Sequence, residues 1–176
     1  MFKIIITVLI AAIILIVVMQ FVDPNLVNQT TTSQSASFEM LTVTIAGEIV
    51  KPGTYLVELD STLNTLVDVA SGLTSNADEL AFDLNYLLEN NQTFYIAPKY
   101  DMSDVCAIEP INKVNINTDV KEKLMSVNGF GSAISDAVIA YRQTQQFKRI
   151  EDIKSVSGIG NATFEKIKNY ITLRSA

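Results

Sequence analysis

Two short glycine-centred segments near the end of the chain carry the backbone groups best suited to bind a ligand. Residues 127–133 and 156–162 share the pattern Val-x-Gly-x-Gly-x-Ala at an offset of 29 residues. A fixed period with matched glycines indicates a duplicated supersecondary unit. Glycine lets the backbone turn tightly and approach a ligand without a Cβ, and the start of the following helix presents unpaired N–H groups to an anion. The pattern therefore predicts two sites for a phosphate oxygen.

Positive charge around these turns must come from other segments, because Ser132 and Asn161, the residues after the second glycines, are not basic. We expect the second turn to be the stronger site, since Lys154, Lys166 and Lys168 are close to it in sequence, whereas the first turn lacks close basic neighbours. In the alternative interpretation, the glycines only cap helices of a scaffold and the basic residues lie on solvated helix faces. The candidate binding residues are Gly129, Phe130, Gly131, Ser132, Ala133, Lys148, Arg149, Lys154, Gly158, Ile159, Gly160, Asn161, Ala162, Thr163, Lys166 and Lys168, with Arg142 and Lys123 as further sources of charge.

The composition argues against most catalytic chemistry. The chain has no His and a single Cys, which removes His-based acid–base catalysis, Ser–His and Cys–His nucleophilic pairs and Cys/His zinc clusters. Cys106 has no internal partner for a disulfide. No catalytic residues, metal site or cofactor are predicted, so we expect a binding protein and not an enzyme.

Charge is distributed unevenly along the chain, whose formal net charge is −6. Residues 1–110 contain 3 basic and 13 acidic side chains, whereas residues 111–176 contain 10 basic and 6 acidic ones. A polyanionic partner is therefore expected to contact only the C-terminal part.

The chain begins with a segment typical of a membrane anchor. Residues 4–22 carry no charge and are mostly Ile, Val, Leu and Ala, and a helix of this length spans roughly 28 Å at about 1.5 Å per residue, close to the thickness of a hydrocarbon core. Lys3 precedes the segment and Asp23 follows it, so the positive-inside rule places the N-terminus in the cytoplasm and the rest outside. A cleaved signal peptide is the alternative. Residues 23–40 are rich in Asn, Gln, Thr and Ser, which predicts a flexible linker.

Residues 41–100 are predicted to form a small α+β unit. Strands are expected at 41–46, 54–59 and 93–97, and an amphipathic helix is expected from Leu63 to a stop at Gly72. Pro52-Gly53 suits the central positions of a type II turn. The acidic residues of this unit are interpreted as a solvated face.

This unit resembles the SLBB domain, a β-grasp variant. The resemblance rests on Val43-x-Ile45-x-Gly47 followed by Lys51-Pro-Gly53, on Val69-Ala-Ser-Gly-Leu-Thr74, on Asp83-Leu-Asn85 and on Phe94-x-Ile96-x-Pro98. It implies binding of a soluble ligand or partner, or self-association. An exposed edge strand would allow a homo-oligomer.

Residues 111–176 are predicted to form four helices in two glycine hairpins around one core. Asp119 and Glu122 fit a capping box for the first helix, with Thr118 as the alternative N-cap. The second helix is expected at 132–143, a short third helix ends at Ile153, and the fourth is expected to turn Tyr170 and Ile171 inward, with Thr163 and Ile167.

The doubled hairpin is the helix-hairpin-helix signature, and this region resembles the DNA-receptor domain of the ComEA-like competence proteins. The matching segments are Val114-Asn-Ile-Asn-Thr118, Gly129-Phe-Gly131, Ile139-Ala-Tyr-Arg142, Phe147-Lys148, Ile150-Glu-Asp-Ile-Lys154, Gly158-Ile-Gly160 and Phe164-Glu-Lys-Ile167. Asn128 stands where the family usually has Pro, and Phe130 where it commonly has Ile. The resemblance implies that the two hairpins grip the phosphate backbone of double-stranded DNA across the minor groove, and that a DNA-uptake channel and a pilus-like machinery cooperate.

The predicted fold class is thus a transmembrane helix, an α+β SLBB domain and an all-α tandem helix-hairpin-helix domain. The predicted function is capture of double-stranded DNA, without sequence specificity, by an extracellular receptor in natural transformation. The alternative is an envelope interaction module whose SLBB domain binds a glycan or protein and whose helical domain is a docking scaffold. The expected order is a cytoplasmic stub (1–3), a single-pass anchor in the cell membrane (4–22), a linker (23–40), the SLBB domain (41–100), a second linker (101–110) and the DNA-binding domain (111–176).

Overall fold

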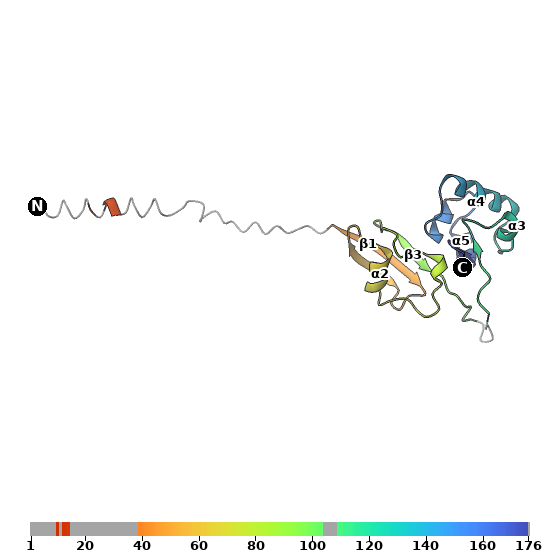
Figure 1. The fold of residues 1–176 in the computed structure, drawn as a ribbon, viewed down its shortest axis with the longest axis horizontal. Coiled ribbons are helices and arrows are strands. Elements are labelled where there is room, and N and C mark those ends of the chain that lie inside the picture. Colours follow the sequence, from red (N-terminus) through yellow and green to blue (C-terminus); the bar gives the residue numbers. More distant parts are fainter. Residues whose placement is uncertain (1–9, 11, 15–38, 104–108, 176) are drawn as a thin grey trace, which may run out of the picture. The chain divides into compact units, whose positions relative to one another are not determined.

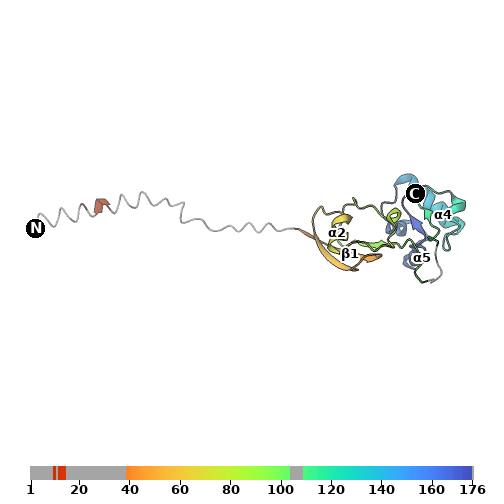
Figure 2. The ribbon, with the colours of Figure 1, turned by 60° about the horizontal axis from the view of Figure 1, so that its bottom comes forward.

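The structure of the protein is a computed structural model that describes residue 10 and residues 12–14, 39–103 and 109–175. The predicted anchor and first linker lie largely outside the described residues, as does the middle of the predicted second linker. Among the helices formed by the described residues, none has the length and apolar character that a membrane span requires. Phe38–Ala176 forms one compact unit, and the following description concerns this unit (Figures 1 and 2).

The first part of the unit contains a three-stranded mixed sheet with the order β2-β1-β3. β1 (Met40–Gly47) pairs antiparallel with β2 (Gly53–Glu58) and parallel with β3 (Thr93–Ile96). Burial alternates along β1, as the period-2 pattern predicts, so that one face of the sheet is packed. The mixed α/β content predicted for this segment is confirmed.

The packed face is covered by helix α2 (Leu63–Val69), which directs Leu63 and Leu66 into a core shared with Val43 and Phe94. The predicted helix stop is also observed: α2 ends at Val69, and Ser71 (φ +70°) followed by Gly72 (φ +93°) ends the regular helix geometry. A 3₁₀-helix, η1 (Glu79–Ala81), was not anticipated.

The type II turn at Pro52-Gly53 was predicted wrongly. Gly53 does not have the positive φ that this turn requires of its third residue, because it is already the first residue of β2 and pairs with Ile45. The chain leaves β1 at Gly47 instead. Gly47 has a φ of +88°, and a Cβ there would collide with the carbonyl oxygen of Ile96.

The C-terminal part contains the two predicted glycine hairpins. The first joins α3 (Lys121–Leu124) to α4 (Ser132–Thr144), and the second joins η2 (Ile150–Ser155) to α5 (Asn161–Ile167). The third segment is a 3₁₀-helix. Helix α4 (Figure 1) covers nearly the range predicted for the second helix, 132–143.

The predicted capping box before α3 is not formed. The helix begins after Val120, which has no side-chain cap, and neither Asp119 nor Thr118 is its N-cap. The Asp119 carboxylate instead accepts the backbone N–H of Asn115 at 2.7 Å and pairs with Lys123 at 2.8 Å. Both contacts are made by the Oδ2 atom of Asp119, so this carboxylate binds Asn115 and Lys123 instead of capping the helix.

The all-α prediction for this part is also wrong, because its two ends pair as a small parallel sheet. β4 (Val114–Asn115) lies beside β5 (Ile171–Thr172). The predicted fourth helix consequently stops at Ile167, Ile171 is buried in a strand, and the Tyr170 side chain is 42% exposed. The pairing joins residues about 57 positions apart, and local periodicity carries no information about such a contact.

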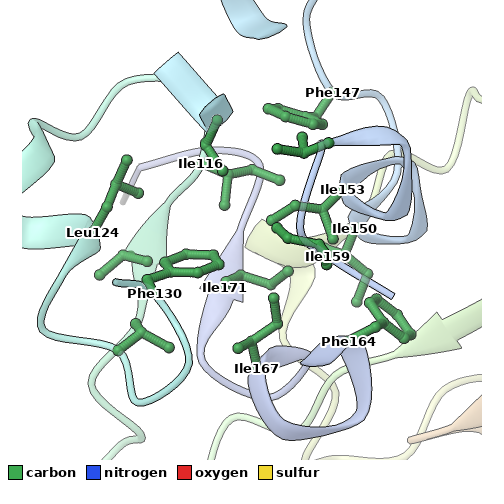
Figure 3. Packing of buried hydrophobic residues seen from close by; sticks show 14 of the residues in the cluster. Ile116, Leu124, Phe130, Phe147, Ile150, Ile153, Ile159, Phe164, Ile167 and Ile171 are labelled. Carbon is green, nitrogen blue, oxygen red and sulfur yellow. The ribbon is translucent and has the colours of Figure 1, made fainter. Parts of the chain in front are cut away.

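One hydrophobic core holds both hairpins together (Figure 3). Phe130 and Ile159 occupy equivalent places in the two glycine turns, and both are 3% exposed. They pack in the same cluster as Leu124, Ile167 and Ile171. Each turn is therefore attached to the core by its own central side chain.

The sheet-containing part and the helical part share an extensive contact. Ala81 and Ala97 belong to the hydrophobic cluster of the helical part. The Arg174 guanidinium donates to the backbone carbonyls of Glu79 and Phe82 at 2.5 and 2.9 Å, and the Leu173 N–H donates to the Leu80 carbonyl at 3.0 Å. These contacts fix the two parts as one unit.

The edge of the sheet at β3 is also covered by the helical part. The Glu151 carboxylate accepts the backbone N–H of Tyr95 in β3, so this edge is partly occupied. The opposite edge, β2, has no strand beyond it in the described sheet, and Leu56 on it is 64% exposed. Self-association through a sheet edge stays a prediction, and β2 is the available edge.

Glu151 is a buried acidic residue at the contact between the helical part and β3, and only 7% of it is exposed. Burial raises the pKa of its carboxyl to about 7, although hydrogen bonds from the backbone N–H groups of Glu151 and Tyr95 and the nearby Arg149 act in the opposite direction. The carboxyl therefore changes its charge close to neutral pH.

We expect Glu151→Gln to flatten the pH dependence of stability. Because the pKa is 4.5 in the unfolded chain and about 7 in the folded protein, the folded state loses stability as pH rises between these values. The loss corresponds to about 3 kcal/mol and is complete above pH 7. Urea unfolding of residues 38–176 at pH 5, 6, 7 and 8 measures it. A difference between variant and wild type that is the same at all four pH values would contradict this assignment.

Candidate nucleic-acid interface

The first glycine of each hairpin has a backbone conformation that other residues rarely adopt. Gly129 has a φ of +121° and Gly158 a φ of +92°, which L side chains seldom allow. In each turn the next residue closes the loop, since Phe130 N–H donates to Val127 at 2.9 Å and Ile159 N–H to Val156 at 3.1 Å. The two turns thus have the same construction.

The two hairpins also pack on each other in an equivalent way. A Cβ on Gly129 would lie 2.9 Å from Ile167 and 3.9 Å from Thr163 in α5, and a Cβ on Gly158 would lie 3.4 Å from Ile134 in α4. Thr163 and Ile134 are themselves 29 residues apart, the same offset as the two glycines. The contacts are therefore reciprocal, as pseudo-two-fold symmetry requires.

The second glycine of each hairpin is placed differently. Gly131 and Gly160 are the N-cap residues of α4 and α5, both have extended backbone, and neither helix start has a side-chain cap. A Cβ at either glycine would have no atom within 4 Å. Both glycines are exposed, so the first N–H groups of these helices are accessible from outside.

The remaining predicted turn residues fall into two groups. Ser132, Ala133, Asn161 and Ala162 are exposed at the helix starts, and Thr163 is half-buried. The side chains of Phe130 and Ile159 are buried in the core, so only their backbone groups are available to a ligand.

The structure changes the relation of the lysines to the two turns. Lys166 lines a cavity of about 770 Å³ together with Ser126 and Asn128 of the first hairpin, and the carboxylates of Asp101 and Glu109 line the same cavity. It precedes Ile167, the residue that Gly129 contacts. Lys154 comes just before the second turn, exposed, with its Nζ 5.0 Å from the centre of the Phe164 ring. Each turn consequently has one lysine near it, and the first is not without basic neighbours.

Two of the basic residues predicted to bind DNA lie at the contact with the sheet-containing part, beside aromatic rings. Lys168 pairs with Glu165 at 2.5 Å and lies 4.1 Å from the centre of the Tyr95 ring. Arg149 pairs with Asp152 at 2.9 Å and lies 5.5 Å from the Tyr86 ring centre. Their charge is thereby partly neutralised.

The other basic residues differ in their surroundings. Lys148 is exposed and lines a groove of about 590 Å³ with Tyr86 and Glu89 of the sheet-containing part. Arg142 donates to the backbone carbonyl of Ile116 at 3.1 Å, which is a structural contact, and Lys123 pairs with Asp119. Sequence reasoning missed the position of Lys166, although the 29-residue repeat, once folded reciprocally, places it beside the first turn.

Comparison with known sequences agrees with this geometry. The pattern of the helix-hairpin-helix motif matches residues 109–172. The chain is 32% identical over 160 residues to ComE operon protein 1 of Bacillus subtilis (strain 168), and the match covers 85% of this chain and 78% of that protein. The chain belongs to the ComE operon protein 1 family. The ComEA-like resemblance predicted from the sequence is thereby confirmed.

Other relatives match a smaller share of the chain. The endonuclease/exonuclease/phosphatase family domain-containing protein 1 of Homo sapiens is 36% identical over 64 residues, which are 36% of this chain and 11% of that protein. An uncharacterized protein of Haemophilus influenzae is 36% identical over 62 residues, covering 34% of this chain and 55% of the relative.

We expect Gly129→Ala to destabilise the protein and Gly131→Ala to leave stability nearly unchanged. The first substitution combines an unfavourable positive φ with a Cβ only 2.9 Å from Ile167, which together cost about 2 kcal/mol or more. The second places a Cβ in open space on extended backbone. Urea unfolding of the two variants of residues 38–176 compares them, and equal losses at both positions would contradict this division of roles.

Proposed function

We propose that this member of the ComE operon protein 1 family binds double-stranded DNA through its phosphate backbone and acts as a DNA receptor in natural transformation. The observation that carries the proposal is the pair of equivalent turns, each with an exposed, uncapped helix start behind Gly131 or Gly160. Two strands of a duplex present phosphates in a two-fold arrangement, and two turns related by the same symmetry suit them.

The contacts available at these turns are of the kind that read no sequence. They consist of backbone N–H groups and of the exposed lysines 154 and 166, and phosphate contacts position a protein on DNA without distinguishing bases. Binding by so few charges is weak for a single molecule. It falls as the salt concentration rises, because the counterions that binding releases from the DNA then contribute less free energy. Several molecules acting together on one duplex would raise the overall affinity.

The proposal is tested by Gly131→Asp, with Gly131→Ala as the matched control. Aspartate is a preferred N-cap, and the position has open space, so the variant keeps its stability while its carboxylate occupies the N–H groups proposed to hold phosphate and repels DNA. We expect at least a tenfold loss of affinity for a duplex in fluorescence anisotropy at about 50 mM salt, and a loss of less than threefold in the alanine variant. Wild-type residues 38–176 that fail to bind duplex DNA at this salt would overturn the proposal and favour a docking scaffold.

The same binding measurement separates the two lysines from other surface charge. Lys154→Gln and Lys166→Gln are each expected to weaken binding to all duplex sequences alike and to reduce the salt slope by about 1. Lys51→Gln, an exposed lysine of the sheet-containing part, serves as the control and leaves binding unchanged. Loss of binding to one sequence alone would contradict recognition of the backbone.

We further propose that residues 4–22 anchor the protein in the cell membrane, so that the two folded parts face outward and pass captured DNA to an uptake channel served by a pilus-like machinery. The support is the uncharged apolar run and the placement of Lys3 before it. We also propose that the sheet-containing part is an SLBB domain, on the sequence resemblance given above.

We expect Ile13→Arg combined with Ile16→Arg to release the full-length protein from the membrane fraction. Each arginine near the centre of a span costs about 3 kcal/mol of insertion free energy. Asn28→Arg combined with Gln34→Arg adds the same charge outside the run and serves as the control. Sedimentation of membranes, followed by detection of the protein in pellet and supernatant, measures the difference. Equal retention of the two double variants would contradict anchoring by this segment.

A further inference from the structure

A second cationic site lies at the contact between the two parts of the compact unit, and none of its lining residues belongs to a glycine turn. It is a cavity of about 280 Å³ lined by four basic side chains, those of Lys99, Lys113, Lys123 and Arg174, and by a single carboxylate, that of Asp78. Lys99 and Asp78 come from the sheet-containing part, whereas the other three come from the helical part. The cavity is therefore complete only when the two parts are together.

The positive charge in this cavity exceeds what its own acids neutralise. Asp78 pairs with Lys113 at 2.6 Å, and their side chains are 11% and 7% exposed. Asp78 thereby neutralises Lys113, and burial lowers the pKa of the Lys113 ammonium, so the excess positive charge comes from the other three basic side chains. Arg174 donates to two backbone carbonyls, which satisfy its N–H groups but leave its charge.

Further charge comes from the cavity's more accessible rim. Lys99 is exposed, and it makes no ion pair within the part of the chain that the structure describes. The Lys123 side chain is 52% exposed and pairs with Asp119, an interaction that water screens. An anion entering the cavity would therefore meet cations from three separate segments of the chain, those that carry Lys99, Lys123 and Arg174.

Neutral hydrogen-bonding groups line the same space. Asn115, Thr172 and Ser175 contribute an amide and two hydroxyls, and the Asn115 Nδ2 donates to the Ser175 Oγ at 3.1 Å. The Thr172 hydroxyl already donates to the Val114 carbonyl at 3.5 Å, whereas the Ser175 hydroxyl can rotate to donate to an anion. Since a water molecule takes about 30 Å³ of liquid, the cavity has room for a phosphate group and several of its waters.

We propose that this cavity binds a phosphate group and, because both parts supply its cations, fastens them to each other. The proposal is independent of DNA binding at the glycine turns. The phosphate has two possible sources of the same chemistry, free inorganic phosphate or a phosphate of the backbone of a bound duplex. Charge-assisted hydrogen bonds from Lys and Arg are the interactions that would hold either one.

The test is the thermal unfolding of residues 38–176, which contain both hydrophobic cores, in 0–10 mM sodium phosphate against sodium chloride of equal ionic strength. Because a ligand that binds only the folded state stabilises it by mass action, we expect a saturable rise in Tm of about 3–5 °C at ten times the Kd. Equal Tm values in phosphate and chloride would overturn the proposal.

Lys99→Gln combined with Lys123→Gln removes the two rim cations while retaining the buried Lys113 and Arg174, which is held by backbone carbonyls. The double variant is expected to keep its Tm in chloride and to lose the phosphate-dependent rise. Lys51→Gln combined with Lys121→Gln removes the same charge outside the cavity, at one exposed lysine and one that pairs with Asp136, and is expected to keep the rise. If phosphate raises the Tm of the two double variants equally, it acts on the protein as a whole, and the assignment of a phosphate site to this cavity is overturned.

Duplex binding by the same variants identifies the source of the phosphate. A salt slope reduced by about 1–2 in Lys99→Gln/Lys123→Gln indicates a DNA phosphate in the cavity, whereas unchanged DNA binding together with a lost phosphate response indicates free phosphate. The rise in Tm with phosphate is measured without DNA. It can therefore be observed even if the protein does not bind duplex DNA, and the two proposals fail independently.

Discussion

The reciprocal packing of the two glycine turns is the contact on which the helical part depends. Gly129 lies against α5, and Gly158 lies against α4, so that each turn is seated on the helix that follows the other. A side chain at Gly129 would separate the two hairpins, because its Cβ would come within 2.9 Å of Ile167. The first glycine of each turn is thus required by packing and backbone conformation, and this requirement holds whether or not the protein binds a ligand.

That packing leaves the second glycines free for another role. Gly131 and Gly160 are exposed, have ordinary extended backbone and border open space, so neither φ nor close packing demands glycine there. An uncapped helix start is a cost to stability that Ser, Asp or Asn would reduce. The open helix start at both equivalent positions leaves backbone N–H groups accessible, as the proposed contact with phosphate requires.

The contact between the two parts explains why charge along the sequence is a poor guide to charge on the surface. Arg149 and Lys168 are drawn towards Tyr86 and Tyr95 of the sheet-containing part, and Arg174 is used to hold backbone carbonyls. The contact also buries Glu151, whose carboxylate accepts the N–H of an edge strand. These residues join the parts, while a smaller number of exposed lysines remains near the turns.

The amino-acid sequence determined the local features of this protein. The 29-residue repeat, the alternation in β1 and the spacing of α2 predicted both hairpins, the strands and the family, because helix and strand periods and glycine turns are properties of neighbouring residues. Tertiary structure decided the features that depend on distant residues. The β4–β5 pairing ended the last helix early, and the seating of Gly129 on α5 brought Lys166 to the first turn. Each is a contact between segments far apart in the chain, and a local pattern holds no record of which distant surface it will meet.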